Sequence, residues 1–300
     1  MTKLKRSVEA WVKRVRMSRF RVWAVVEGAS RDVPFYESLL VQGAHCDSVS
    51  VIQASDLEVD GSCSGGKSHS LKIFRALQGL NGLEQENNAT IIDVIFFLDR
   101  DDDDYLGLLE TDPHVAYTSH ADVEAEIASH TCLQAAVAHA FSISRTDAER
   151  AIPGSAISDL ANIWSEWIAL RLAAEECDWG GARFAQSSKI NVPKFGEVDP
   201  ELQVKVCTEI TKEDPDGWRD ALERARAHVF GLMASGKGAR LVKGKWLTEY
   251  IAHLVASDFS GERPVPKVSR DQFMSTCSVS VDYEKVWVAY QGQLDQVLAK

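Results

Sequence analysis

The stretch "TIIDVIFFLDRDDDD", from Thr90 to Asp104, joins the most apolar run of the chain to its densest group of acids. A near-continuous run of β-branched and aromatic residues favours a strand that is buried on both faces. Asp99 follows this run directly, so its carboxylate is expected at the carboxyl end of the strand. Open α/β sheets place their ligand sites at that end. The stretch therefore predicts a buried strand that delivers carboxylates to a site.

Similar strands and helices alternate on both sides of this run. "RVWAVVEG" (21–28) and "CDSVSVIQ" (46–53) read as buried strands, and a shorter strand is expected near 114–117. The segments 30–43 and 67–80 have helical patterns between them. This alternation predicts an α/β fold with a mostly parallel sheet flanked by helices. Helical patterns dominate the rest, so a mainly helical C-terminal half is expected.

Three regions are expected along the chain: a basic N-terminal helix over 1–20, a catalytic α/β domain over 21–130, and a mainly helical domain over 131–300. The last would serve dimerisation or partner binding, with Trp164 and Trp167 either supplying an apolar contact or packing in the domain's own core. Residues 1–21 carry eight basic side chains against the single acid Glu9, in a chain of net charge -11. This segment either attracts nucleic acid or an acidic partner, or packs its apolar side inward with a solvated basic face.

Composition narrows the class of protein. Of 300 residues, 45% are hydrophobic and 26% charged, which is ordinary for a globular protein. No apolar stretch approaches the roughly 18 residues of a membrane span, and the N-terminus lacks the apolar segment of a secretory signal. The six cysteines form no C-x-x-C pair, so zinc and disulfide frameworks are not expected. We expect a cytoplasmic protein with no membrane partner.

Carboxylates follow two of the expected strands. Glu27 ends one, and Asp99 with Asp101 ends the other, so all three are expected at one edge of a parallel sheet. Clustered carboxylates repel one another unless they splay into water or hold a cation. Oxygen ligands of this kind suit Mg²⁺ or Mn²⁺. The pattern predicts a divalent-cation site, with Asp103 and Asp104 in a solvated turn and the ligands among 101–104 left open.

Parts of the sequence also match the patterns of other protein classes. "GSCSGGKS" (Gly61–Ser68) matches the phosphate-loop pattern of NTPases, with Lys67, Ser68 and Asp99 in the corresponding roles. The polar segment before Gly61 separates it from the preceding strand, which weakens this reading. "DRD" could also serve an aspartyl phosphatase, although that class usually carries its aspartates near the N-terminus. A module that only binds and regulates an ATPase is a third alternative.

Four segments in order, "VVEGASRDVPFYESLL", "GGKSHSLKIFRAL", "FFLDRDDDD" and "YTSHADVEAEI", resemble the TOPRIM fold of topoisomerases, primases and related nucleases. Their order and spacing are most similar to OLD-like TOPRIM nucleases, and among these to the AriB-type nuclease effectors of PARIS anti-phage defence systems. The resemblance covers roughly residues 20–130. No catalytic tyrosine arrangement or zinc module is evident, so topoisomerase and primase activities are not expected.

The resemblance implies roles for particular residues. Glu27 would be a metal ligand or general base, Asp99 and Asp101 would be the D-x-D metal pair, and Glu124 would complete the metal site. Lys245, in "VKGKWLTEYI", would stabilise charge on the transferred phosphate.

Further positions are less clearly assigned by the resemblance. Lys237 and Lys243 compete with Lys245 for its role. Asp122 and Glu126 either support Glu124 or are surface residues. Gly65, Gly66 and Lys67 would support the acidic edge, and Asp32 has a helix-capping role as its simplest interpretation.

The resemblance also implies a wider function. It points to a Mg²⁺-dependent endonuclease that is held by an ABC-type ATPase sensor and released as the toxic effector of abortive infection. The implied substrate is tRNA, with DNA as the alternative, and the active form would be a homodimer.

Overall fold

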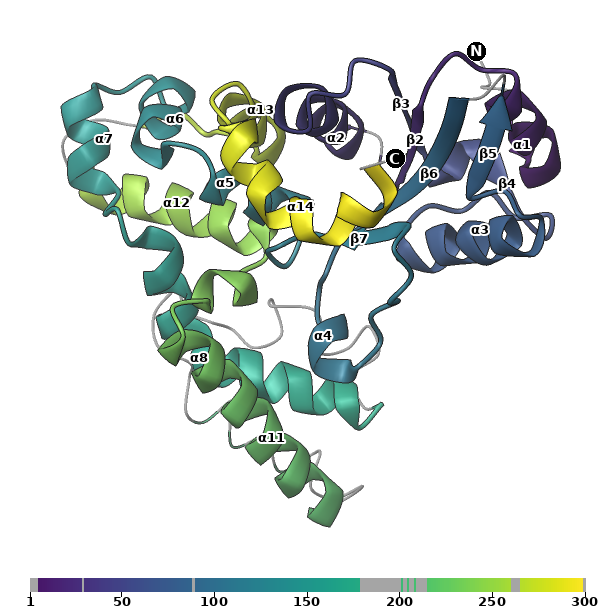
Figure 1. Cartoon of the computed structure of the whole chain (residues 1–300). Coiled ribbons are helices and arrows are strands. Elements are labelled where there is room, and N and C mark those ends of the chain that lie inside the picture. Colours follow the sequence, from purple (N-terminus) through teal and green to yellow (C-terminus); the bar gives the residue numbers. More distant parts are fainter. Residues whose placement is uncertain are drawn as a thin grey trace. The chain divides into compact units, whose positions relative to one another are not determined.

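The computed structural model of the chain describes residues 5–28, 30–87, 90–178, 215–259 and 265–298, with the isolated positions 201, 204 and 208. The chain divides into two compact units. The first comprises residues 1–100, 109–126 and 281–300, and the second comprises 101–108 and 127–280. Figure 1 shows the elements of both units, coloured along the sequence. Among the described helices, none has the length and apolar character that crossing a bilayer requires.

The first unit contains a five-stranded mixed sheet, a two-stranded sheet and flanking helices. In chain order its elements are β1 (Arg6–Ser7), α1 (Val8–Arg16), β2 (Val22–Val26), α2 (Asp32–Ser38), the π-helical turn η1 (Leu39–Gly43), β3 (Val49–Gln53), the 3-10 turn η2 (Ala54–Asp56), β4 (Leu57–Glu58), α3 (Lys67–Gly79), β5 (Glu84–Asn87), β6 (Thr90–Leu98), β7 (Val115–Tyr117), α5 (Val123–Ser129) and α14 (Tyr283–Leu298). The boundary between the units falls within α5.

The main sheet has the order β3-β2-β6-β5. Strand β7 pairs with the last residues of β6, after those that pair with β5. The β2–β3, β2–β6 and β6–β7 pairs are parallel, and the β5–β6 pair is antiparallel. All five residues of β2 are buried, as the apolar run predicts. The α/β fold with a mostly parallel sheet is thus confirmed, with one antiparallel strand added.

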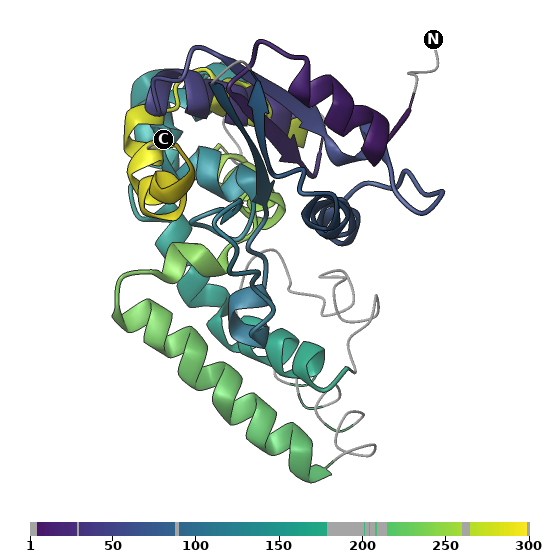
Figure 2. The same ribbon diagram turned by 45° about the vertical axis from the view of Figure 1, so that its right-hand side comes forward.

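Helices cover the two faces of this sheet. On one face, α1 and α3 pack against Trp23, Val25 and alternate residues of β6. On the other face, Tyr36 of α2 stacks on Phe97 at 4.2 Å between ring centroids, and Tyr290 of α14 lies 5.9 Å from the same ring. Figure 2 shows α1 and α3 together on one side of the strands. The alternation of side chains along each strand therefore supplies both cores.

The second unit is helical, in agreement with the expected helical C-terminal half. Its elements are α4 (Asp103–Leu106), α6 (Leu133–Ala140), α7 (Arg145–Ala151), α8 (Ala156–Glu176), α11 (Pro215–Ala234), the 3-10 turn η4 (Gly238–Leu241), α12 (Gly244–Asp258) and α13 (Arg270–Ser278). Trp164, Trp167 and Trp246 form a buried aromatic cluster in edge-to-face contacts. Trp164 and Trp167 thus pack in the core of this unit and do not form an exposed contact surface.

The division into units differs from the expected boundaries in three places. The N-terminal helix is part of the first unit, because its Trp11 packs edge-to-face on Trp23 of β2. The last helix, α14, also belongs to the first unit, where the Gln293 amide exchanges hydrogen bonds with the backbone of Tyr117 at 3.0 and 3.1 Å. The short segment 101–108 belongs to the second unit. The described residues of the 131–300 region are therefore mainly helical but do not form a single unit.

Candidate functional site

Glu27 and Asp99 leave the sheet at the same edge. In the parallel pairing of β2 with β6, Val26 lies opposite Phe97, so both acids follow directly after the last paired residues. The backbone N–H of Asp99 donates a hydrogen bond to Glu27 Oε1 at 2.9 Å. The two strand ends are thus joined through the Glu27 side chain, and both carboxylates are partly exposed.

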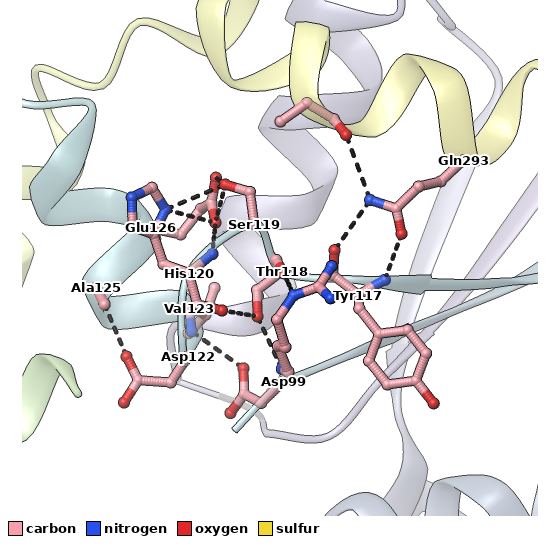
Figure 3. Close-up of polar contacts among 12 residues, drawn as sticks. Asp99, Tyr117, Thr118, Ser119, His120, Asp122, Val123, Ala125, Glu126 and Gln293 are labelled. Atoms are coloured by element: carbon pink, nitrogen blue, oxygen red, sulfur yellow. Dashed lines mark hydrogen bonds and ion pairs between the residues drawn. The ribbon is translucent and has the colours of Figure 1, made fainter. Parts of the chain in front are cut away.

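The loop after β7 brings the start of α5 to the same edge. The Val123 N–H donates to Asp99 Oδ1 at 3.0 Å, and the Ala125 N–H donates to Asp122 Oδ1 at 2.8 Å (Figure 3). Asp122 therefore caps α5, because its side chain satisfies an N–H group that has no partner within the helix. This geometry places Glu124 in the first turn of α5, next to the N–H group that binds Asp99. The Glu124 side chain is buried, as is that of Asp122.

A second loop, between β2 and α2, contributes another acid. The Gly28 N–H donates to Asp32 Oδ2 at 2.7 Å, and Arg31 forms an ion pair with Glu124. Asp32 is the first residue of α2 rather than its N-cap, a position that Arg31 occupies without a side-chain cap. The expected capping role of Asp32 is therefore wrong, because its carboxylate turns back toward the Glu27–Gly28 strand end.

The charge of Glu124 reaches Asp32. Burial raises the pKa of the Asp32 carboxyl above its ordinary value, the Gly28 N–H opposes this rise, and the negative charge of Glu124 adds to it. Burial also raises the pKa of the Tyr36 phenol, with contributions from Tyr290, Asp99 and Asp32. Asp32 therefore lies close enough to Glu124 and Tyr36 for their charges to interact, and burial disfavours negative charge on Asp32.

The loop that carries α5 is fixed by an internal network. The fully buried Glu126 carboxylate accepts hydrogen bonds from the Ser119 hydroxyl at 2.7 and 2.8 Å and from the His120 N–H at 3.0 Å (Figure 3). Arg100 Nε donates to the Thr118 carbonyl at 2.8 Å, and the Arg100 N–H donates to the Thr118 hydroxyl at 2.9 Å. Glu126 is thus a buried positioning group rather than a surface residue.

The glycine-rich loop also reaches the acidic edge. A Cβ atom added at Gly65 would lie 3.8 Å from the Glu27 carbonyl oxygen. Gly66 has φ 86° and directly precedes α3, so it takes a backbone conformation that side chains disfavour. Gly65 therefore lies next to the backbone of the strand end, and the supporting role of the Gly65–Lys67 segment stays a prediction.

The same loop does not form a phosphate-binding turn over its whole length. Val59 and Ser62 exchange backbone hydrogen bonds at 3.0 and 2.9 Å, which places Gly61 in a tight turn. The preceding strand, β4, has two residues and pairs with β1 outside the main sheet. A phosphate loop requires a sheet strand that leads straight into its first glycine. Only the last residues of "GSCSGGKS", Lys67 and Ser68, lie at the start of a helix, α3.

Asp101–Asp104 belong to the second unit, where Asp101, Asp102 and Asp104 each form an ion pair with a basic side chain. Lys243 Nζ lies 2.9 Å from Asp101 Oδ1, and Arg171 makes a two-pronged contact with Asp102. Arg240 lies 3.3 Å from Asp104. The expected solvated turn is thus wrong for Asp104, which is partly buried and paired.

The lysine closest to this acidic segment is not the expected one. Lys243 contacts Asp101 and lies 3.6 Å from Asp102, whereas Lys245 is exposed on the first turn of α12. Lys243 is the N-cap residue of α12 and has an extended backbone, whereas Lys245 lies within the helix. Within the second unit, the geometry favours Lys243 over Lys245.

The structure thus brings three of the five expected residues, Glu27, Asp99 and Glu124, together in the first unit and places Asp101 and Lys245 in the second. Asp32 and Arg31 join the first group. The sequence feature that marks Asp32 is its position four residues after Gly28. A side chain at Gly28 would lie 3.1 Å from the Asp32 carboxylate oxygens. No protein-family model matches the sequence, and no curated protein matches it.

Proposed function

We propose that the chain is a Mg²⁺-dependent endonuclease of the TOPRIM kind, with its site at Glu27, Asp99 and Glu124 and with Asp32 as an added acid. The observation that carries this proposal is the hydrogen bond from the Asp99 N–H to Glu27 Oε1, at 2.9 Å. It joins two strand-end carboxylates at the edge of a parallel sheet, where α/β enzymes bind their ligands. Asp101 and Lys245, with Lys243 as the alternative lysine, are proposed as further site residues from the motif resemblance alone.

The residues present fit a hard divalent cation. The four acids of the proposed site, Glu27, Asp32, Asp99 and Glu124, offer oxygen ligands, and Mg²⁺ binds to a few carboxylates while it keeps several waters. The raised pKa of Asp32 reflects burial together with the charge of Glu124, and a divalent cation would offset that charge. Mn²⁺ fits the same ligands. When bound, the ion supplies Lewis-acid stabilisation of phosphate charge and an activated water.

The chain's own groups hold these ligands in place. The Asp99 N–H fixes one oxygen of Glu27, and the Val123 N–H fixes one oxygen of Asp99. Arg31 balances the charge of Glu124, and we propose that it also contacts a substrate phosphate, because guanidinium groups match phosphate oxygens. Glu27 is proposed as metal ligand or as general base for the attacking water.

The wider role is proposed from the motif resemblance alone. The chain would be the toxic effector of an anti-phage abortive-infection system, restrained by an ABC-type ATPase sensor and cleaving tRNA once released, as a homodimer. A DNA endonuclease and a non-catalytic regulatory module are the alternatives. The phosphate-loop NTPase is disfavoured by the tight turn at Gly61.

A cleavage assay tests the activity. The purified chain, alone and with a co-expressed ATPase partner, is incubated with tRNA and with plasmid DNA in Mg²⁺, Mn²⁺ or EDTA. We expect cleavage only with metal, and a loss of roughly 100-fold or more in Glu27→Gln and Asp99→Asn. The control is Glu37→Gln, because Glu37 is exposed on α2. Cleavage that survives EDTA or Asp99→Asn contradicts the proposed site.

The same preparation separates the alternatives. ATP hydrolysis that Lys67→Ala abolishes would support an NTPase. Binding to the ATPase without any cleavage would support a regulatory module.

A further inference from the structure

One surface of the first unit is strongly basic in an otherwise acidic chain. It is formed by α1, by the residues just before it and by the turn that follows. Its basic side chains are all exposed, and we call them the basic face: Lys5, Arg6, Lys13, Arg14, Arg16, Arg19 and Arg21. Between residues 5 and 21 the only acid is Glu9, whereas the whole chain has a net charge of -11. The positive charge is thus concentrated on one helix and its flanks.

Several of these guanidinium groups are held in position. The Arg14 guanidinium lies 5.6 Å from the centre of the Trp23 ring, and that of Arg19 lies 5.8 Å from the Phe20 ring. Arg16 Nε donates a hydrogen bond to the Gln85 side chain. A basic side chain that is already positioned loses less conformational freedom when it binds an anion. These contacts therefore favour a binding role over a merely solvated face.

The opposite side of α1 is not available for insertion into a membrane. Its apolar residues Val8, Trp11, Val12 and Val15 are buried in the core of the first unit. An amphipathic helix that binds a bilayer must insert its apolar side into the lipid. Because this side is occupied by the protein core, only the charged side of α1 is available to a partner.

The basic face and the acidic edge share the first unit. Helices α1 and α3 pack together on one face of the sheet (Figure 2). Helix α3 starts directly after Gly66, in the loop whose Gly65 adjoins the Glu27 backbone, and it exposes Lys72 and Arg75 along its length. A polyanion on α1 would therefore continue along α3 toward the strand ends.

We propose that the basic face binds the phosphodiester backbone of a nucleic acid and delivers it to the acidic edge. The delivery step rests on the proposed nuclease function, whereas the binding step does not. Lys and Arg side chains that neutralise phosphates release counterions, so the binding constant falls as salt concentration rises. Contacts of this kind recognise the backbone without regard to sequence.

The test measures binding separately from cleavage. Fluorescently labelled RNA of tRNA size, single-stranded DNA and duplex DNA of equal length are titrated with the full chain in EDTA between 50 and 200 mM salt. The variant combines Lys13→Gln, Arg14→Gln and Arg19→Gln. For three lost contacts to a single strand, we expect the slope of log K against log salt to shrink by about 2. The affinity at 0.1 M salt should fall roughly 100-fold.

Two controls guard against trivial effects. Replacing the exposed bases Arg219, Lys267 and Arg270 of the second unit with glutamine removes the same charge and should change the slope by less than about 1. The variant with Arg14→Lys and Arg19→Lys keeps the charge and should keep the slope. Unfolding by urea checks that each variant folds.

The outcomes separate the two proposals. If the folded triple variant binds every nucleic acid as tightly as the parent chain, the proposed role of the basic face is wrong. It is also wrong if the parent chain binds anionic lipid vesicles but no nucleic acid. Binding with the expected salt slope but without metal-dependent cleavage supports the basic face and refutes the nuclease. Comparison of the three probes shows whether the basic face binds RNA or DNA more tightly.

Discussion

Replacing Asp102 with asparagine should destabilise the second unit by about 3–5 kcal/mol, because it leaves the buried Arg171 guanidinium without its counter-charge. The Arg171 and Asp102 side chains are 7% and 17% exposed, and they meet in a two-pronged contact. The guanidinium also lies 5.4 Å from the centre of the Trp246 ring. Glu175 and Asp101 also act on the Arg171 charge, but Asp102 has the larger effect, so most of the desolvation cost of Arg171 would remain uncompensated.

The effect should depend on pH in a defined direction. Burial by itself would raise the pKa of Asp102, but the charge and hydrogen bonds of Arg171, aided by Lys243, outweigh burial and hold the pKa well below its ordinary value. A lowered pKa in the folded state stabilises the fold above the unfolded-state pKa of about 3.9, and this stability is lost as pH falls toward the folded-state pKa. Between pH 6 and pH 3, the parent chain should lose roughly 1 kcal/mol relative to the variant.

Urea unfolding followed by tryptophan fluorescence measures this loss, because the buried Trp164–Trp167–Trp246 cluster lies in the same unit. The matched control is Asp104→Asn, whose partner Arg240 is 3.3 Å away and more exposed, so a loss below about 1 kcal/mol is expected. Replacing Asp102 and Arg171 together by leucine and methionine should recover much of the stability. Equal losses in the two single variants, or a gap that widens at low pH, would refute the reasoning.

Three further changes test the first unit and the acidic segment. Gly28→Ala places a methyl group 3.1 Å from both oxygens of Asp32, so we expect roughly tenfold slower cleavage with little change in urea midpoint. Arg31→Gln frees the Glu124 carboxylate from its cation, and a magnesium titration of cleavage should show half-saturation at a concentration lower by roughly tenfold. Lys243→Met removes the ammonium group closest to the acidic segment, and single-turnover cleavage should slow by at least roughly tenfold if this lysine stabilises phosphate charge.

The strand ends were predictable from sequence because their signals are local. The apolar runs 22–26 and 90–98 form β2 and β6, and the acids that follow each run leave a parallel sheet at one edge by geometry alone. The helical spacing of apolar residues after Lys67 likewise predicts α3, whose buried residues include Phe74 and Leu77. The general fold and the meeting of Glu27 with Asp99 follow from these features.

Other features depend on contacts between distant segments and had no local signal. Strand β5 has the polar sequence "EQEN", in which only Gln85 is buried, so no hydrophobic pattern marks it. Helix α14 joins the first unit through Tyr290 and Gln293, which contact residues far earlier in the chain. The ion pair between Arg31 and Glu124 joins residues 93 positions apart. Amphipathic patterns show that such segments pack, but not which partners they choose.

The acidic run after β6 reads in sequence as one group, yet its carboxylates have different partners. Asp99 is fixed by the first unit, whereas Asp101 and Asp102 share Lys243 in the second. Two unit charges about 4 Å apart interact by about 4 kcal/mol at an effective dielectric constant of 20, so a metal ion that binds Asp101 must compete with the lysine. If Asp101 is a metal ligand, Asp101→Asn should raise the Mg²⁺ concentration at half-maximal cleavage, and Lys243→Met should lower it. If Asp101 only orients Lys243, both variants should slow cleavage equally and leave the magnesium midpoint unchanged.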